Sequence, residues 1–309
     1  MISVIICSVK PSQVSRLEKN IAETIGNVEY EVIAFDNRNT HYGLCEIYNL
    51  CAEKSRYDNL CFAHEDIQFD TIGWGEKIIP KLSETDCGVI GFAGTTARIS
   101  ALCGIGLSRA HWRSNYIQHM NKGGMKSCFK NPDRVEFSPV VSVDGMCLFV
   151  SRKVWQEVRF DEKTFPNFHL YDLDFTTAVF RAGYINYICN TVIVEHFSEG
   201  YYTQEWLAAT IDFNNKWRDA LPLYVSGFPC IKNLDRYVRS REFRFIKAMM
   251  KSRGKCSWEL IDGLCRQYYR KYPFYIVIVN AGSGKVVFKV ISYLYIVLQR
   301  IRDFFILDF

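Results

Sequence analysis

Charged and imidazole side chains directly follow an apolar run near residue 60. Leu60–Ala63 is apolar, His64, Glu65 and Asp66 come next, and apolar residues then resume. An apolar run of this length that stops at charged residues is typical of a buried strand leaving a sheet. Ligands of open α/β sheets bind beyond the carboxyl ends of the strands. The stretch is therefore a candidate site for a divalent cation or a phosphate, and a solvated turn is the alternative.

Further polar interruptions of the same kind are predicted at strand ends or helix starts. The carboxyl ends of parallel strands gather at one edge of a sheet, so these residues would face one crevice. Carboxylates combined with imidazole suit Mn²⁺ or Mg²⁺. A carboxylate at a helix start is ordinarily a cap. Capping is therefore the simpler interpretation of Asp172 or Asp174 taken alone. The groups are Asp36-Asn37, Asp144-Gly145, Asp172-Leu173-Asp174 and His196.

Strand and helix patterns alternate in the part of the chain that carries these groups. Continuous apolar runs predict strands over Ile2–Val9, Glu31–Phe35 and from Leu60. Apolar residues at helical spacing predict a helix in each interval between them. Strand, helix, strand, helix, strand with short links indicates a parallel, right-handed βαβαβ unit. The predicted fold class is α/β, with a mostly parallel central sheet flanked by helices.

The pattern is less regular in the second half of the chain. Residues 95–137 show no lasting period, and we expect a long loop that is functional or mobile. Beyond about Tyr202, helical patterns replace the alternation. Other predicted elements are helices over Ile72–Leu82, Arg152–Glu157 and Asp172–Ala182, and strands over Cys87–Gly94, Val140–Val150, Tyr184–Ile188 and Thr191–Glu195.

Charge divides the chain into two unequal parts. Residues 232–309 carry 16 Lys/Arg against 6 Asp/Glu, whereas the remainder has a net charge of −5. With 309 residues, 49% of them hydrophobic, the chain can hold one large domain and an appendage. We predict an α/β domain over 1–225 and a basic, mainly helical extension over 226–309.

Cysteine usage indicates a reducing compartment. The twelve cysteines include no C-x-x-C pair, and several lie singly in apolar runs. This pattern favours buried thiols in a cytoplasmic protein over disulfides or a zinc ribbon. The first residues enter a strand pattern directly, without a basic leader or a cleavage site.

The C-terminal stretch leaves two interpretations open. Tyr272–Phe309 is the most apolar part of the chain, but basic residues interrupt it before it reaches the roughly 18 apolar residues of a membrane span. It fits an amphipathic helix on the inner face of an anionic membrane. It equally fits a helix packed on the core or in a homo-oligomer interface. Nucleic-acid binding is not favoured, because the basic charges are spread along apolar periodic segments. Ala281–Lys285 lacks the earlier glycine and the Ser/Thr of a phosphate loop.

The stretch Ile2–Ser198 resembles the family-2 glycosyltransferases of GT-A fold. The opening strand ISVIICSV, which ends near Ser8, is similar to the strand that cradles the nucleotide base in that family. EVIAFDN places Asp36, with Asn37 beside it, where the family has an acidic residue that contacts the uracil or ribose. The resemblance implies a nucleotide-sugar donor.

The family's Asp-x-Asp motif has a variant counterpart in this chain. LCFAHED places His64 at the first acidic position and Asp66 at the second. In the family this motif binds the metal and the donor diphosphate, so the resemblance implies Mn²⁺ or Mg²⁺ held by Asp66 with His64. VIVEH ends at His196, in the place of the family's late histidine, often a contact to metal or diphosphate. Glu65 is expected to take no part.

The second half of the resemblance implies the remaining site residues. In VDGMCLFV, Asp144 and Gly145 would line the donor sugar pocket. The family's Glu-Asp-x-Asp motif corresponds to YDLD, where tyrosine replaces the glutamate and Asp172 becomes the catalytic base. Asp174 would support the helix start, and His169 would contact donor or acceptor.

The implied reaction is transfer of a sugar from a nucleotide diphosphate, with inversion, to a hydroxyl of a glycan or a lipid-linked acceptor. It would belong to cell-surface polysaccharide or glycoconjugate synthesis. Two alternatives are a non-catalytic glycan- or nucleotide-sugar-binding protein on a degenerate transferase fold, and a sugar-nucleotide pyrophosphorylase. The latter usually has a glycine-rich loop after its first strand, and Cys7–Pro11 is not one.

Overall fold

A mixed, seven-stranded sheet is the centre of the fold in the computed structural model, which describes residues 1–105, 110–200, 203–251 and 257–272. Five of its strands run in one direction, and β12 and β10 run in the other. The α/β class expected from the sequence is confirmed. The order across the sheet is β10 (Phe137–Val140), β13 (Ile185–Cys189), β5 (Cys87–Gly91), β12 (Cys147–Ser151), β3 (Asn59–His64), β1 (Ile2–Ser8) and β2 (Tyr30–Asp36).

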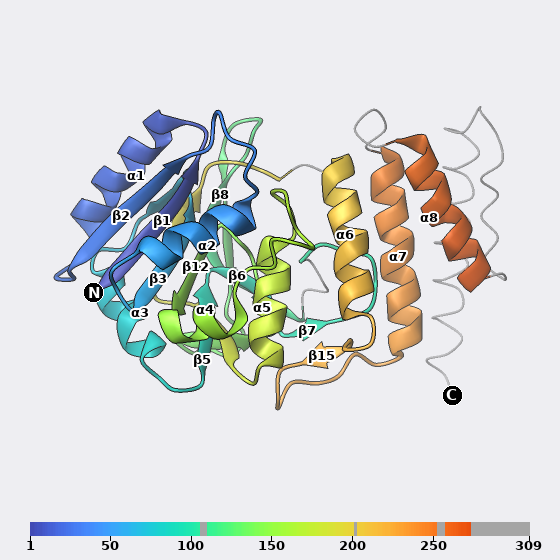
Figure 1. Cartoon of the computed structure of the whole chain (residues 1–309). Helices are drawn as coiled ribbons and strands as arrows, with labels where there is room; N and C mark the ends of the chain where they lie inside the picture. The colour runs from blue at the N-terminus through green and yellow to red at the C-terminus, as the bar shows by residue number, and fades with distance from the viewer. Residues whose placement is uncertain (106–109, 201–202, 252–256, 273–309) are drawn as a thin grey trace. The chain divides into compact units, whose positions relative to one another are not determined.

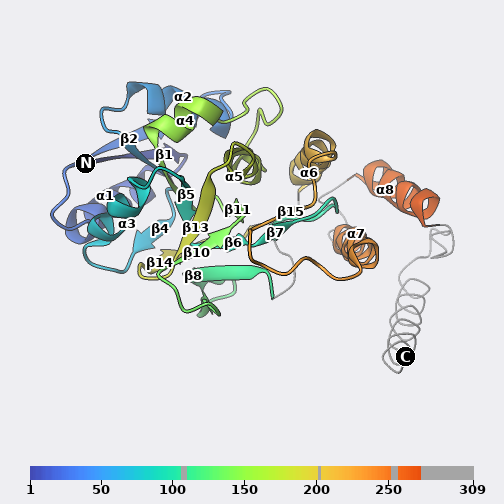
Figure 2. The ribbon, with the colours of Figure 1, turned by 90° about the horizontal axis from the view of Figure 1, so that it is seen from below.

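Helices cover both faces of this sheet (Figures 1 and 2). Ile2, Val4 and Ile6 of β1 pack on the face with α1 and α3, whereas Ile5 packs on the opposite face. A strand buried on both faces reads as an unbroken apolar run, which is why the sequence predicted β1. The first face carries α1 (Pro11–Thr24) and α3 (Trp74–Leu82), and the second carries α2 (Leu44–Lys54), α4 (Arg152–Val158), α5 (Tyr171–Arg181) and part of α6 (Gln204–Trp217).

The expected long loop over residues 95–137 is wrong, because β-strands run through this segment. Its main feature is a hairpin of β8 (Trp112–His119) and β9 (Met125–Lys130). The strand pattern was hidden because polar side chains of β8 are buried and paired: Arg113 donates to Asp133, and Asn115 donates to the carbonyl of Val192. The hairpin belongs to a second sheet with β4 (Ile67–Phe69), β6 (Ala93–Thr95), β11 (Ser142–Val143) and β14 (Val194–His196), and β7 (Ala97–Arg98) pairs with β15 (Leu223–Tyr224).

The chain forms two compact units, Met1–Arg241 and Glu242–Phe309. Helix α7 (Leu234–Lys251) begins in the first unit, where Val238 packs against Ala97 and Ile99. In the second unit, Lys271 at the end of α8 (Trp258–Lys271) pairs with Glu242. The helical patterns expected beyond residue 202 are confirmed in α6, α7 and α8, but the helix expected within Tyr272–Phe309 lies, after its first residue, outside the described residues. No helix in the described ranges is long and apolar enough to cross a membrane.

Candidate active site

The predicted site residues gather at one edge of the central sheet. β1, β2 and β3 run parallel and end there at Ser8, Asp36 and His64. β12 runs antiparallel to β3 and begins at the same edge, where the amide of His64 donates to the carbonyl of Met146. The Asp144-Gly145 pair therefore comes from the amino end of a strand.

The three side chains expected to bind a cation form a cluster. Potential ligand atoms of His64, Asp66 and His196 lie within 4.8 Å of one another. An oxygen of Asp66 is 3.9 Å from His64 Nδ1 and 3.7 Å from His196 Nε2. These separations are too long for hydrogen bonds but suit three ligands around one small ion.

The protonation pattern around His196 fits a metal ligand. The side-chain nitrogen Nε2 of Gln118 lies within donating distance of the carbonyls of His119, His196 and Ser198. The side-chain oxygen Oε1 of Gln118 therefore faces His196 Nδ1, at 3.3 Å, as an acceptor. His196 therefore carries its proton on Nδ1, and Nε2 keeps a lone pair. This Nε2 is buried without a hydrogen-bond partner in the described structure. A histidine ligand that donates its other ring proton to a fixed acceptor is typical of metal sites.

The charge state of the cluster also suits a cation. Burial, reinforced by His196, lowers the pKa of His64 to about 4, so the imidazole is neutral at pH 7. Burial raises the pKa of Asp66, but His196 and the Ser198 hydroxyl outweigh it and leave that pKa below its ordinary value. Two neutral imidazoles and one carboxylate form a donor set that Mn²⁺ accepts.

Asp172 and Asp144 are partly buried carboxylates that interact with each other. Burial, and then the Asp144 charge, raise the pKa of Asp172 to about 7. Burial likewise raises the pKa of Asp144. The charged form of Asp172 is disfavoured because the group is desolvated beside a second carboxylate.

A glycine is needed at position 145, where the turn before β12 lies against the start of α5. The amide of Gly145 donates to Asp172 Oδ2 at 2.9 Å, and its carbonyl accepts from the Tyr171 hydroxyl at 2.8 Å. A Cβ atom at this position would lie 2.2 Å from the Tyr171 oxygen and 2.8 Å from the Asp172 Cβ. The close approach of α5 to this turn therefore requires glycine, and Gly145 shapes the site through its backbone.

Ser8 is held by a residue that was expected to be a bystander. Its hydroxyl donates to Glu65 Oε2 at 2.6 Å. The amides of Val9 and Lys10 donate to the same oxygen at 3.2 and 2.9 Å. Glu65 thus fixes the turn after β1, at the place where a nucleotide was predicted to bind.

Asp36 and Asn37 organise the turn after β2. The guanidinium of Arg38 binds Asp36 through two nitrogens and lowers the pKa of that carboxyl to about 2. The Asn37 amide nitrogen donates to the carbonyl of Tyr42 at 3.3 Å, and its side-chain oxygen accepts from Thr40. Both side chains remain at the edge where the nucleoside was expected.

A hollow of about 330 Å³ opens beside these turns, and we call it the first hollow. This volume is at the lower end for ligand pockets and suits a nucleoside better than an entire nucleotide sugar. Phe168 lines it, is 55% exposed, and lies 5.9 Å from the His64 ring between centroids, so it joins the first hollow to the cation cluster. The lining residues are Cys7, Asn37, His41, Tyr42, Gly43, Leu44, Pro166, Asn167, Phe168, His169, Thr203 and Glu205.

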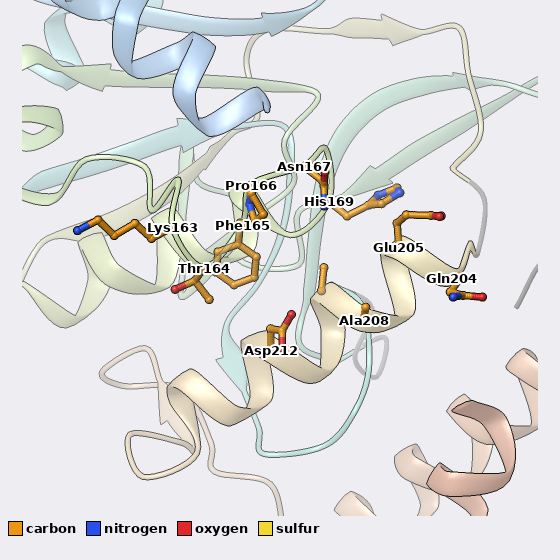
Figure 3. Close-up of a pocket in the computed structure, with 11 residues that line it drawn as sticks. Lys163, Thr164, Phe165, Pro166, Asn167, His169, Gln204, Glu205, Ala208 and Asp212 are labelled. Atoms are coloured by element: carbon orange, nitrogen blue, oxygen red, sulfur yellow. The ribbon is translucent and has the colours of Figure 1, made fainter. Parts of the chain in front are cut away.

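A second hollow of about 330 Å³ continues along α6 (Figure 3). It shares His169 and Glu205 with the first hollow, and Figure 3 shows these two side chains close together near the start of α6. His169 is also 3.4 Å from the Thr203 hydroxyl. Asp212 lines the other end of the second hollow, near Phe165.

Asp174 joins two helices. Its buried carboxylate accepts from Lys216 Nζ and Trp217 Nε1, each at 2.8 Å. It therefore binds α5 to α6 rather than only supporting the helix start, because the end of α6 supplies both donors.

The sequence did not indicate Gln118, which orients His196 from within the segment expected to be a loop. Nor did it indicate a role for the Tyr171 hydroxyl, which contacts His64 Nε2 at 2.9 Å. Both roles depend on partners that are distant in sequence, and no local pattern marks them. The one available signal was that Tyr171 stands where an acidic residue was expected.

Residues 3–217 match the family described as "Glycosyltransferase like family". No curated protein matches the chain.

Solved structures of glycosyltransferases are similar to this chain at low identity. GalNAc-T7 with UDP, GalNAc and Mn²⁺ is 11% identical with a TM-score of 0.47, over 88% of this chain and 58% of that one. The mannosyltransferase PcManGT from Pyrobaculum calidifontis, in complex with GDP-Man and Mn²⁺, is 10% identical with a TM-score of 0.49, over 95% and 84%. TarS from S. aureus is 10% identical with a TM-score of 0.39, over 64% and 36%. Since all three TM-scores are below 0.5, family membership rests on the sequence match.

Proposed function

Because this chain belongs to the glycosyltransferase like family, we propose that it transfers a sugar from a nucleotide diphosphate sugar, a UDP-sugar, to an acceptor hydroxyl with inversion at the anomeric carbon. The observation that carries the proposal is the gathering of a cation-binding cluster and a carboxylate of raised pKa at one sheet edge. Gly145 and Tyr171 connect the two parts, since Gly145 binds Asp172 and Tyr171 binds His64.

The three residues His64, Asp66 and His196 would hold Mn²⁺ or Mg²⁺. Such an ion supplies positive charge for the diphosphate that departs. The first hollow would take the nucleoside, with Ser8, Asp36 and Asn37 at its edge, and Asp144, Gly145 and His169 would lie around the sugar. For Asp36, Ser8, the cluster and Asp144 this assignment follows the strand order β2-β1-β3-β12, and His169 comes from the segment before α5.

Asp172 would act as the general base. Its carboxylate takes the acceptor proton while the acceptor oxygen forms a bond to C1 of the sugar, and the bond from C1 to the phosphate oxygen breaks. The electron pair of that bond leaves with the nucleoside diphosphate. A pKa of about 7 makes Asp172 a stronger base than an ordinary carboxylate and leaves much of it ionised at neutral pH.

A thermal-shift panel tests donor and cation together. UDP-, GDP- and dTDP-sugars are each added with and without Mn²⁺, and we expect a UDP-sugar with Mn²⁺ to raise the melting temperature most. Asp66→Asn should abolish the Mn²⁺-dependent part of the shift. No shift with any donor would contradict the proposal.

Substitution of the base separates an enzyme from a binding protein. Asp172→Asn keeps the size of the side chain and its capacity to accept from Gly145, so donor affinity should change less than threefold. Turnover should fall by about 10² to 10⁴. A protein that only binds nucleotide sugars would show no turnover in either form. Release of nucleoside diphosphate with glycosylated acceptor excludes a pyrophosphorylase, which releases pyrophosphate or nucleoside triphosphate.

We further propose that the acceptor is a glycan or lipid-linked molecule of cell-surface polysaccharide synthesis, reached from the cytoplasmic side. The support is the excess of basic residues over 232–309, which suits an anionic membrane surface. The division into a transferase domain over 1–225 and a peripheral or oligomer-forming extension over 226–309 belongs to the same proposal.

A further inference from the structure

The two positions at which this chain departs from the expected acidic pattern contact each other. His64 replaces the first aspartate of Asp-x-Asp, and Tyr171 replaces the glutamate before Asp172. The Tyr171 hydroxyl lies 2.9 Å from His64 Nε2, although 107 positions separate the two residues. Tyr171 is 3% exposed, so water does not compete freely for this contact.

The hydrogen-bond donors of this pair can be assigned one by one. A tyrosine hydroxyl has one proton to donate. Tyr171 donates it to the carbonyl of Gly145, which can only accept, at 2.8 Å. Toward His64 the hydroxyl can therefore only accept, so Nε2 must carry the proton of the neutral ring.

The consequence appears at the other nitrogen of the ring. With the proton on Nε2, Nδ1 of His64 keeps a lone pair. Nδ1 is the atom that faces Asp66, at 3.9 Å. His196 is set in the opposite tautomer by Gln118, and its free Nε2 faces the same carboxylate. Two separate orienting groups thus turn two imidazole lone pairs toward one point.

We propose that Tyr171 is a positioning residue that fixes the His64 tautomer and thereby allows a histidine to replace an acidic cation ligand. The inference rests on the proposed function only in that the cluster binds a divalent cation. It assigns no proton transfer or substrate contact to Tyr171.

Tyr171→Phe tests the assignment through Mn²⁺ affinity, measured by electron paramagnetic resonance or calorimetry. The ring and its packing are kept, but Nε2 loses its acceptor, and the proton can move to Nδ1 and block the ligand. We expect affinity to fall about ten- to hundredfold. Tyr187→Phe is the matched control: it removes the hydroxyl of another buried tyrosine, whose ring contacts Lys81 instead of the cluster, and should leave the affinity unchanged.

A double-mutant cycle shows whether Tyr171 acts through His64. In a His64→Ala background, Tyr171→Phe should have no further effect on Mn²⁺ affinity. An equal loss in both backgrounds would mean that the hydroxyl acts through the fold, and would overturn the assignment. So would a Tyr171→Phe protein that binds Mn²⁺ as tightly as the wild type.

Side-chain ¹⁵N NMR of the metal-free wild type gives a readout that needs no variant. Protonation of His64 at Nε2 supports the assignment, and protonation at Nδ1 overturns it even if Tyr171→Phe fails to fold. A wild type that binds no Mn²⁺ would overturn both this assignment and the cation in the proposed function. A wild type that binds Mn²⁺ with a different tautomer overturns this assignment alone.

Discussion

At the residue scale, the raised pKa of Asp172 determines how the rate should depend on pH. A general base acts in its ionised form, and this carboxyl has a pKa of about 7. We therefore expect log kcat to rise with unit slope below about pH 7 and to level off above it. The dependence of kcat on pH is measured with saturating donor and acceptor at pH values below and above about 7. A rate that is flat down to pH 5 would contradict the role of Asp172.

The neighbouring carboxylate provides a second test of the same pKa. Because the Asp144 charge contributes to the raised pKa of Asp172, Asp144→Asn should move the midpoint of the kcat profile to lower pH. Glu84→Gln removes an exposed carboxylate far along the chain from the site, and its midpoint should match the wild type. If both variants keep the wild-type midpoint, another group controls the profile.

At the scale of elements, the ion pairs of Lys216 test how much the contact between α5 and α6 stabilises the fold. Lys216 pairs with Asp174, whose side chain is 3% exposed, and with Asp161, whose side chain is 28% exposed. Asp174→Asn should lower the free energy of unfolding by about 3 kcal/mol, because it removes the buried negative charge that pairs with Lys216 and leaves one acceptor oxygen for two donors. Asp161→Asn should cost less than about 1 kcal/mol. Equal losses in urea unfolding would show that burial does not decide the strength of this pair.

The elements also show what the sequence could predict. β1 and β3 were predictable because each is buried on both faces and reads as an apolar run. β8 was not, because Arg113 and Asn115 are buried with partners that only the folded chain supplies. The site divides in the same way. Its strand-end residues follow from local pattern, whereas the orienting contacts of Gln118 and Tyr171 arise from tertiary structure.

At the scale of the whole molecule, the uneven charge predicts binding to anionic bilayers. A truncation near residue 226 would remove Val238 from its contacts with Ala97 and Ile99, so ending the chain after Tyr272 is the cleaner comparison. The full chain has four more Lys/Arg than this shortened form. At about 1 kcal/mol for each basic residue near the surface, we expect it to sediment with anionic liposomes at least about tenfold more strongly.

Salt should weaken this sedimentation, and neutral liposomes should bind both forms poorly. Equal partition of the two forms onto anionic liposomes would contradict a membrane role for residues 273–309.

The position of β12 between β3 and β5 has a consequence for synthesis on the ribosome. About 80 residues separate Asp66 from Cys147, where β12 begins. At roughly 5–20 residues per second, a nascent chain presents the open edges of β3 and β5 for several seconds before the strand that joins them exists. His64 and Asp66 are synthesised early, but the carbonyl that accepts from the His64 amide arrives only with Met146. Competence for ligand binding should therefore emerge in one late step, and chains stalled before β12 should depend on chaperones.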